Sequence, residues 1–161
     1  MLFSDKELRE ILLSEDQDFL EELYKKARET AKATFSNKIY IRALIEFSNY
    51  CKEGCYYCGI NRNKSSVHRF RLSKEEIYSA AETAYEAGFR TFVLQGGEDT
   101  YFTDEIFSEI ISHLKKNYDA AITLSLGVRS YESYKMFKDA GADRFLLRHE
   151  TADKDIFQKL H

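Results

Sequence analysis

The chain has 161 residues, of which 43% are hydrophobic and 32% are charged, and its formal net charge is −3 at pH 7. This length allows one ordinary hydrophobic core, and the composition is typical of a soluble globular protein. The small negative charge gives no reason to expect a nucleic acid or an anionic membrane surface as a partner. No apolar run approaches the roughly 20 residues that span a bilayer, so no membrane segment is expected.

Two helices are predicted before any strand. Ser4 can cap a first helix that ends near Leu13, and a second helix from about Asp16 to Thr34 carries apolar residues at helical spacing. This spacing indicates packing against a neighbour rather than a binding face. We therefore interpret residues 1–36 as an N-terminal helical appendage.

From residue 37 onward, predicted strands alternate with predicted helices. The strands are expected at 39–47, 91–95, 121–126 and 144–147, and the helices at 73–88, 103–117 and 130–140, with a last helix that Asp153 can cap. This alternation is typical of parallel α/β architecture with right-handed crossovers. Four such units make about half of a TIM-type barrel, so residues 37–161 are expected to form the N-terminal half of a barrel in a truncated or longer protein. A half-barrel predicts exposed apolar surface at its open sheet.

All three cysteines of the chain lie in one loop after the first predicted strand. Cys51, Cys55 and Cys58 have the spacing C-x-x-x-C-x-x-C, and thiolates favour iron–sulfur clusters and zinc. Three cysteines leave one iron of a [4Fe–4S] cluster without a protein ligand, and an open position is typical of catalytic metal sites. The alternative is a zinc-binding or electron-transfer module with His68 as fourth ligand. Clustered thiols with none left for disulfides favour a reducing cytoplasm.

The residues around these cysteines resemble the radical S-adenosylmethionine (SAM) superfamily, whose signature has this spacing and an aromatic residue, here Tyr57, before the third cysteine. The strings IEFSNYCKEGCYYCGINR, FVLQGGED, TLSLG and RFLLRHETA resemble, in that order, the [FeFe]-hydrogenase maturases of the biotin synthase group. The resemblance implies a radical SAM barrel with a [4Fe–4S] cluster held by the three cysteines. It also implies that SAM chelates the open iron and is cleaved by one electron to methionine and a 5′-deoxyadenosyl radical.

In such barrels the active site lies in the loops at the carboxyl ends of the strands. The cysteine loop, the Gly-Gly-Glu-Asp string, the Ser-Leu-Gly string and the Arg-His-Glu-Thr string each follow or end one of the four predicted strands. The resemblance implies that SAM is bound by Tyr57 at the adenine, by Glu150 at the ribose, and elsewhere by Gln95, Gly96, Gly97, Glu98, Thr123 and Ser125.

Structural alternatives exist for several of these residues. Tyr57 can simply pack in its loop, and Gly96-Gly97 alone is an ordinary turn. Thr123 and Ser125 share one face of their strand, which is the solvent face in an isolated strand but points inward in a barrel. Val128 stands where relatives tend to carry an acid, so no role is expected of it.

Three arginines complete the candidate site. Arg42 and Arg144 fall within apolar predicted strands, where an unpaired charge is costly, so Glu46 or an acidic ligand is the expected partner. The resemblance implies that Arg42, Arg144 and Arg148 bind anionic groups of a substrate, whereas a surface ion pair with Glu150 is the alternative for Arg148. His149 is expected to be structural. The basic run formed by Arg62, Lys64, His68, Arg69 and Arg71 is interpreted as a solvated loop, with a border of the SAM pocket or a reductase docking surface as alternatives.

The sequence thus predicts a radical SAM enzyme of [FeFe]-hydrogenase maturation that acts on a small-molecule or organometallic substrate. The expected partners are a ferredoxin- or flavodoxin-type electron donor and other hydrogenase maturation proteins. The alternatives are an enzyme like methylornithine synthase, an enzyme like biotin synthase, the non-enzymatic metal module, and a fragment that is inactive by itself.

Overall fold

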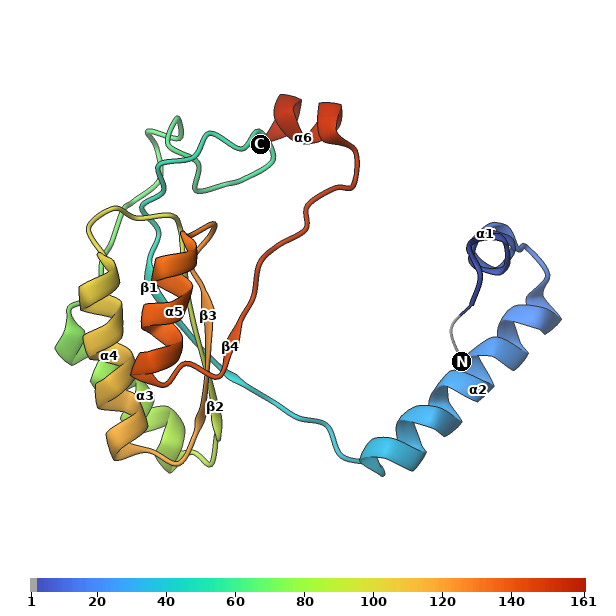
Figure 1. The fold of residues 1–161 in the computed structure, drawn as a ribbon, viewed down its shortest axis with the longest axis horizontal. Coiled ribbons are helices and arrows are strands. Elements are labelled where there is room, and N and C mark those ends of the chain that lie inside the picture. Colours follow the sequence, from blue (N-terminus) through green and yellow to red (C-terminus); the bar gives the residue numbers. More distant parts are fainter. Residues whose placement is uncertain (1–2) are drawn as a thin grey trace. The chain divides into compact units, whose positions relative to one another are not determined.

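The computed structural model describes residues 3–161, and the chain divides into two compact units, Met1–Tyr40 and Ile41–His161. The first unit holds the two predicted helices, α1 (Asp5–Leu13) and α2 (Gln17–Phe35) (Figure 1). The Ser4 hydroxyl accepts a hydrogen bond from the Glu7 backbone N–H, and the Glu7 carboxylate accepts one from the Ser4 N–H, so a capping box starts α1. None of the described residues 3–40 is buried, so this described part has no core of its own.

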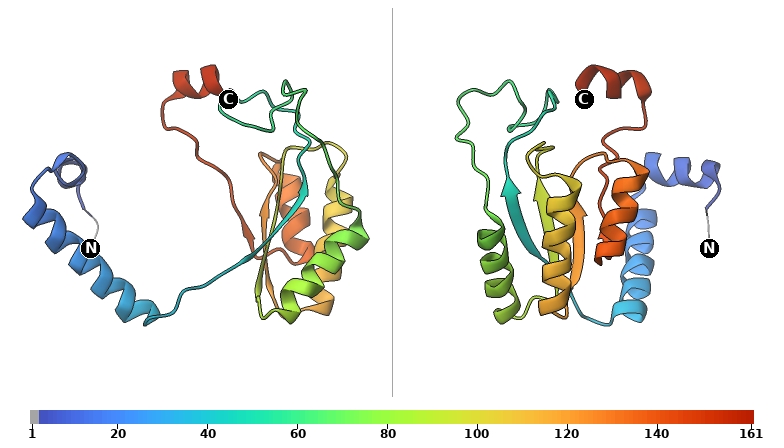
Figure 2. Two further views of the ribbon diagram at one scale, coloured as in Figure 1. Left: turned by 180° about the vertical axis from the view of Figure 1, so that it is seen from behind. Right: turned by 60° about the vertical axis from the view of Figure 1, so that its left-hand side comes forward.

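The second unit is the predicted series of alternating strands and helices. Its elements are β1 (Ala43–Ser48), α3 (Lys74–Glu86), β2 (Thr91–Gly96), α4 (Asp104–Asn117), β3 (Ala121–Ser125), α5 (Tyr131–Ala140), β4 (Arg144–Phe145) and α6 (Lys154–Leu160). The four strands form one parallel sheet in the order β1-β2-β3-β4. Helices α3, α4 and α5 lie together on one face of this sheet (Figure 2). The unit therefore has the α/β half-barrel architecture that the sequence predicts.

Alternate residues of the strands face the helices and make the core. Phe92 and Leu94 of β2 and Ile122 and Leu124 of β3 are all completely buried. Rings from β1 and the helices pack beside them, with the centroid of Phe47 4.8 Å from that of Phe102 and 5.0 Å from that of Phe107. The intervening strand residues must point to the opposite, uncovered face of the sheet. Leu44 of β1 is more than half exposed, which agrees with the apolar surface expected of a half-barrel.

Two predicted strands are shorter than expected. The segment predicted as strand 39–47 begins at Ala43, which pairs with Phe92 one residue into β2, so Ile39–Arg42 have no strand beside them. Arg42 is therefore exposed before the strand, and its predicted position within an apolar strand is wrong. Strand β4 ends at Phe145 rather than residue 147, because among the described residues only β3 pairs with it.

Among residues 3–161, no helix combines the length and the apolar character that crossing a membrane requires.

Candidate functional site

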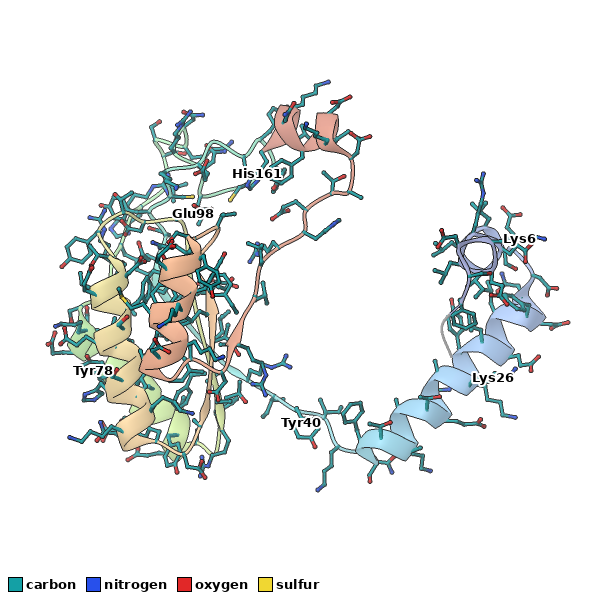
Figure 3. All side chains as sticks on the ribbon, viewed as in Figure 1. Lys6, Lys26, Tyr40, Tyr78, Glu98 and His161 are labelled. Carbon is teal, nitrogen blue, oxygen red and sulfur yellow. The ribbon has the colours of Figure 1, made fainter. Side chains whose placement is uncertain are left out.

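A cavity of about 340 Å³ lies at the carboxyl ends of the four strands and is lined by the loops that follow them. The sequence-predicted residues that line it are Cys51, Cys55, Cys58, Tyr57, Gln95, Gly96, Gly97, Glu98, Ser125, Arg148 and Glu150. Of the predicted set, Arg42, Thr123 and Arg144 do not line it. His161, at the end of α6, also lines the cavity and lies at the same end of the unit as Glu98 (Figure 3). Residues distant in sequence thus meet where the topology predicts a site.

The cysteine loop is held from behind by Asn61 and Arg69. The buried Asn61 amide donates to the carbonyl oxygens of Cys55 and Cys58, at 3.2 and 2.8 Å. The Arg69 guanidinium donates to the carbonyls of Asn49, Ile60 and Asn61. The interpretation of this basic run as a solvated loop is therefore wrong for Arg69, whose charge organises the backbone that carries the thiols.

The three thiols differ in their surroundings. Cys55 is buried, and this burial raises the pKa of its thiol. Cys51 is partly exposed, and its Sγ accepts a hydrogen bond of 3.4 Å from the backbone N–H of Glu98. Backbone donation to a ligating sulfur is one of the interactions that tune iron–sulfur clusters.

The arrangement of the thiols tests the predicted metal chemistry. Among residues 3–161, no group of three His, Cys, Asp or Glu side chains could hold a single metal ion. His68 is exposed and does not line the cavity, so the zinc alternative with His68 as fourth ligand is not supported. In a [4Fe–4S] cluster each cysteine binds a different iron, so such a cluster does not require the three thiols to converge on one point.

His161 is a neighbour of the cysteine loop that no sequence pattern predicts. Its Nδ1 atom lies 3.2 Å from Cys55 Sγ and 3.0 Å from the Tyr57 hydroxyl. The contact arises because the Tyr56 N–H donates to the Leu160 carbonyl and so holds the end of α6 against the cysteine loop. Partial burial and the nearby Glu150 carboxylate raise the pKa of Tyr57 to about 12. No local pattern predicts a contact over 106 residues.

Gly96 and Gly97 bring the end of β2 into backbone contact with the cysteine loop. A Cβ atom at Gly96 would lie 2.5 Å from the Phe47 ring, and one at Gly97 would overlap the Tyr50 carbonyl and lie 2.8 Å from Cys51 Cβ. The Gly97 N–H donates to the Ser48 carbonyl at 3.2 Å. Only glycine permits this close approach. The glycines therefore set the distance between the first cysteine and the residue that follows them.

That residue, Glu98, directs a largely buried carboxylate toward the cavity. Its Oε2 lies 3.2 Å from Lys52 Nζ, and the side chain is 15% exposed. Its Oε1 accepts a hydrogen bond of 3.4 Å from the Val128 N–H. Val128, at the position where the resemblance leads one to expect an acid, thus contributes its backbone while its side chain is exposed.

The neighbouring Asp99 is buried and does not line the cavity. Its carboxylate accepts hydrogen bonds from both the Nε and a terminal nitrogen of Arg71, from the Ser48 hydroxyl at 2.6 Å and from the Tyr101 N–H at 3.1 Å. Burial by itself raises the pKa of Asp99, but these donors outweigh it and hold the pKa below its ordinary value. Sequence reasoning did not single out Asp99 or its pairing with Arg71.

Polar side chains of the other strands extend across the uncovered face of the sheet. An Arg148 terminal nitrogen donates to Gln95 Oε1 at 3.3 Å, and the Gln95 amide donates to Glu46 at 3.5 Å. Arg148 thus contacts Gln95, and no ion pair between it and Glu150 occurs within residues 3–161. The Glu150 backbone has a φ of 61°, a left-handed conformation that is uncommon outside glycine and clusters at functional sites.

The remaining predicted residues lie at the border of the site or away from it. Thr123 is buried on the same face as Ser125, and its hydroxyl has no hydrogen-bond partner among the described residues. Arg144 is exposed and pairs in register with Thr123, farther from the carboxyl ends of the strands than the residues that line the cavity. His149 is exposed, and its carbonyl accepts from the Thr151 N–H.

Comparisons with known proteins add independent findings. The family model for the radical SAM superfamily matches residues 45–161. The chain is 43% identical over 158 residues to the [FeFe] hydrogenase maturase subunit HydE of Thermotoga maritima, an alignment that covers 98% of this chain and 45% of that protein. It is 35% identical to the 3-methylornithine synthase of Methanosarcina acetivorans, again over 98% of this chain and 45% of that protein.

A solved structure shows the same architecture. The crystal structure of methylornithine synthase (PylB) superposes with a TM-score of 0.88 at 31% identity, covering 99% of this chain and 48% of that one. The chain thus spans about half the length of the relatives it matches.

Proposed function

The chain belongs to the radical SAM superfamily, and from this we propose that it takes part in the reductive cleavage of SAM at a [4Fe–4S] cluster during [FeFe]-hydrogenase maturation. The observation that carries the proposal is the cavity in which the three thiols meet the Glu98 carboxylate and the polar ends of β3 and β4. The similarity to the Thermotoga maritima maturase supports the choice of pathway. Members of this superfamily are enzymes that use a cluster and SAM.

In this proposal Cys51, Cys55 and Cys58 hold the cluster, and its fourth iron is free for SAM. When bound and reduced, the cluster supplies the electron that breaks the carbon–sulfur bond of SAM, giving methionine and a 5′-deoxyadenosyl radical. The protein positions the reactants and excludes water from them.

Different residues of this chain would bind different parts of SAM. The Glu98 carboxylate suits the methionine ammonium, because it is largely buried and already accepts from Lys52 and the Val128 N–H. Gly96 and Gly97 line the cavity with their backbone, and Ser125 and Gln95 offer polar groups at the same cavity. Tyr57 and Glu150 also line the cavity, and adenine and the ribose hydroxyls would bind beside them. Thr123, whose buried hydroxyl has no hydrogen-bond partner within the described part of the chain, would complete the polar face.

The substrate would be a small organic or organometallic molecule with anionic groups. Arg148 lies in the cavity wall, and among residues 3–161 its guanidinium is bound only to the neutral Gln95 amide, so it can still bind an anion. Arg144 and Arg42 are exposed, and they would bind anionic groups of the substrate farther from the carboxyl ends of the strands. A ferredoxin- or flavodoxin-type protein would supply the electron, and other maturation proteins would receive the product.

The proposal is tested by anaerobic reconstitution with iron and sulfide, followed by dithionite reduction and electron paramagnetic resonance with and without SAM. We expect about four irons per chain and a reduced-cluster signal whose shape changes when SAM is added. Cys58→Ala should lose the cluster, whereas Glu98→Gln should keep the cluster and lose much of the response to SAM. One tightly bound zinc per chain, or a signal from the unaltered protein that does not change when SAM is added, would contradict the proposal.

A second candidate is a mutase like methylornithine synthase, favoured by the superposition with that enzyme. Both candidates require the same cluster and the same cleavage of SAM. They are distinguished by the product: 3-methylornithine should form in a SAM-dependent reaction only if the second assignment is right.

A further inference from the structure

Glu98 and Asp99 are adjacent acids with different surroundings. The Glu98 carboxylate lines the cavity, whereas Asp99 is buried and is not part of the cavity wall. Both acids follow the end of β2, where the Asp99 N–H donates to the Gly97 carbonyl at 2.8 Å and the backbone turns, so the two side chains have different surroundings. Only Glu98 can therefore reach a ligand in the cavity, so Asp99 must act on the site through other residues.

Asp99 joins three segments that are far apart in the sequence. Its carboxylate accepts from the Ser48 hydroxyl at the end of β1, from Arg71 in the segment before α3, and from the Tyr101 N–H in the loop before α4. Ser48 and Arg71 are also paired as an isolated antiparallel bridge. The Asp99 side chain is 1% exposed, so these interactions are shielded from water.

The same group of residues holds the backbone beside the first cysteine. The Arg71 guanidinium lies 3.8 Å from the centre of the Tyr50 ring, a cation–π contact with the residue directly before Cys51. From the other side, Gly97 packs against the Tyr50 carbonyl. The Lys52 N–H then donates to the Glu98 carbonyl at 3.1 Å, and the Glu98 N–H donates to Cys51 Sγ at 3.4 Å. These contacts connect the backbone that carries the Cys51 thiol directly to the backbone that carries the Glu98 carboxylate.

We propose that Asp99 and Arg71 are positioning residues that fix the Cys51 thiol relative to the Glu98 carboxylate. The inference rests on the proposed function, because it assigns to these two groups the cluster and the methionine end of SAM. A ligand that must reach both at once binds well only if their separation is correct. Loss of the carboxylate charge should therefore weaken SAM binding more than it weakens cluster binding.

The test compares Asp99→Asn with Asp143→Asn in the full chain. Asp143 is a matched control, because its carboxylate also accepts from a backbone N–H, that of Ile122, and from a cation, Lys115, but at the start of β3, away from the cavity. The first readout is the dissociation constant of SAM, taken from the change in the reduced-cluster spectrum. We expect Asp99→Asn to keep its iron content and to weaken SAM binding by about tenfold, as loss of a charged hydrogen bond does, and Asp143→Asn to leave it unchanged. Arg71→Lys, which keeps the charge but loses the two-nitrogen contact, should give an intermediate value and replaces Asp99→Asn if that variant does not fold.

The second readout is amide hydrogen exchange in the metal-free chain, which needs neither cluster nor SAM. The amides of Lys52 and Gly97 should exchange faster in Asp99→Asn than in the unaltered chain or in Asp143→Asn. If the unaltered protein shows no response to SAM, the proposed function fails and exchange alone decides on the positioning role. Unchanged exchange at these two amides, or SAM binding weakened no more than in Asp143→Asn, overturns the inference.

Discussion

The side chain of Glu98 crosses directly over Gly127 at the end of β3. Gly127 has a φ of 75°, and a Cβ atom there would overlap the Glu98 carboxyl group. The next residue, Val128, donates its N–H to Glu98 Oε1. The turn after β3 therefore both makes room for the carboxylate and fixes its direction.

Replacing Gly127 with alanine should displace this carboxylate. The left-handed backbone costs an alanine about 1 kcal/mol, and the methyl group forces Glu98 away from Val128. We expect SAM affinity to fall about tenfold, the cost of one charge-assisted hydrogen bond, with the iron content unchanged. Gly59→Ala is the control, because a Cβ atom there meets nothing within 4 Å. Equal SAM titration curves for the two variants would contradict the prediction.

The thiols should differ in reactivity before any metal binds. Burial raises the pKa of Cys55, and thiolate is the form that reacts with iodoacetamide. At about pH 8, peptide mapping by mass spectrometry of the metal-free chain should find Cys55 alkylated more slowly than Cys51 and Cys58, which are less buried. Modification of Cys55 first would show that the loop is not closed around it.

Low pH should destabilise the second unit because the Asp99 carboxylate becomes protonated. Because its pKa in the folded chain lies below its ordinary value of 3.8, the carboxylate contributes stability that is present above that value and is lost as the pH falls through the folded pKa. The urea midpoint of the unaltered chain should therefore drop more between about pH 7 and pH 3 than that of Asp99→Asn. Parallel pH dependence of the two proteins would remove Asp99 as the cause.

Truncating Asn61 should impair assembly of the metal site. Asn61→Ala leaves the carbonyls of Cys55 and Cys58 without their side-chain donor, a loss of about 1–3 kcal/mol for buried groups. We expect slower reconstitution and fewer irons retained on gel filtration. Asn63→Ala is the matched control, since Asn63 is exposed and bonds Asn61 through its backbone N–H alone. Similar iron retention by both variants would argue against a role of the Asn61 amide.

The aromatic core should dominate the stability of the second unit. Phe107 is completely buried, and its ring packs on those of Phe47, Phe102 and Phe137. Phe107→Ala should lower the free energy of unfolding by about 3–5 kcal/mol, measured by urea denaturation. Tyr131→Ala, at a 77% exposed position, should change it by less than about 0.5 kcal/mol.

The order of the elements and the ends of the helices could be predicted from the sequence because they depend on neighbouring residues. Ser4 caps α1 and Asp153 caps α6 as predicted, Ser73 and Thr103 cap α3 and α4 where these helices are predicted to begin, and Gly141 closes α5. The strand–helix alternation, together with the parallel sheet that it predicts, also placed the four chemically distinctive strings at one edge of the sheet.

The extent of a strand, by contrast, depends on its partner. Ile39–Arg42 have the composition of a strand, but the paired part of β1 starts at Ala43, opposite Phe92 in β2. Strand β4 stops early for the same reason. Propensity is a property of one segment, whereas a backbone hydrogen-bond ladder needs two.

The tertiary structure also decided which polar residues serve the site and which support it. Glu98 and Asp99 are adjacent and chemically alike, yet one lines the cavity and the other is buried against Arg71. The sequence pattern places Arg69 in a solvated loop, but its guanidinium donates to backbone carbonyls beside the cysteines. His161 contacts Cys55 although the two residues are 106 positions apart in the sequence. Residue types and spacing determined that this chain carries three thiols and acids at strand ends. Their directions, and the partners that hold them there, follow from contacts between distant segments, which only folding brings together.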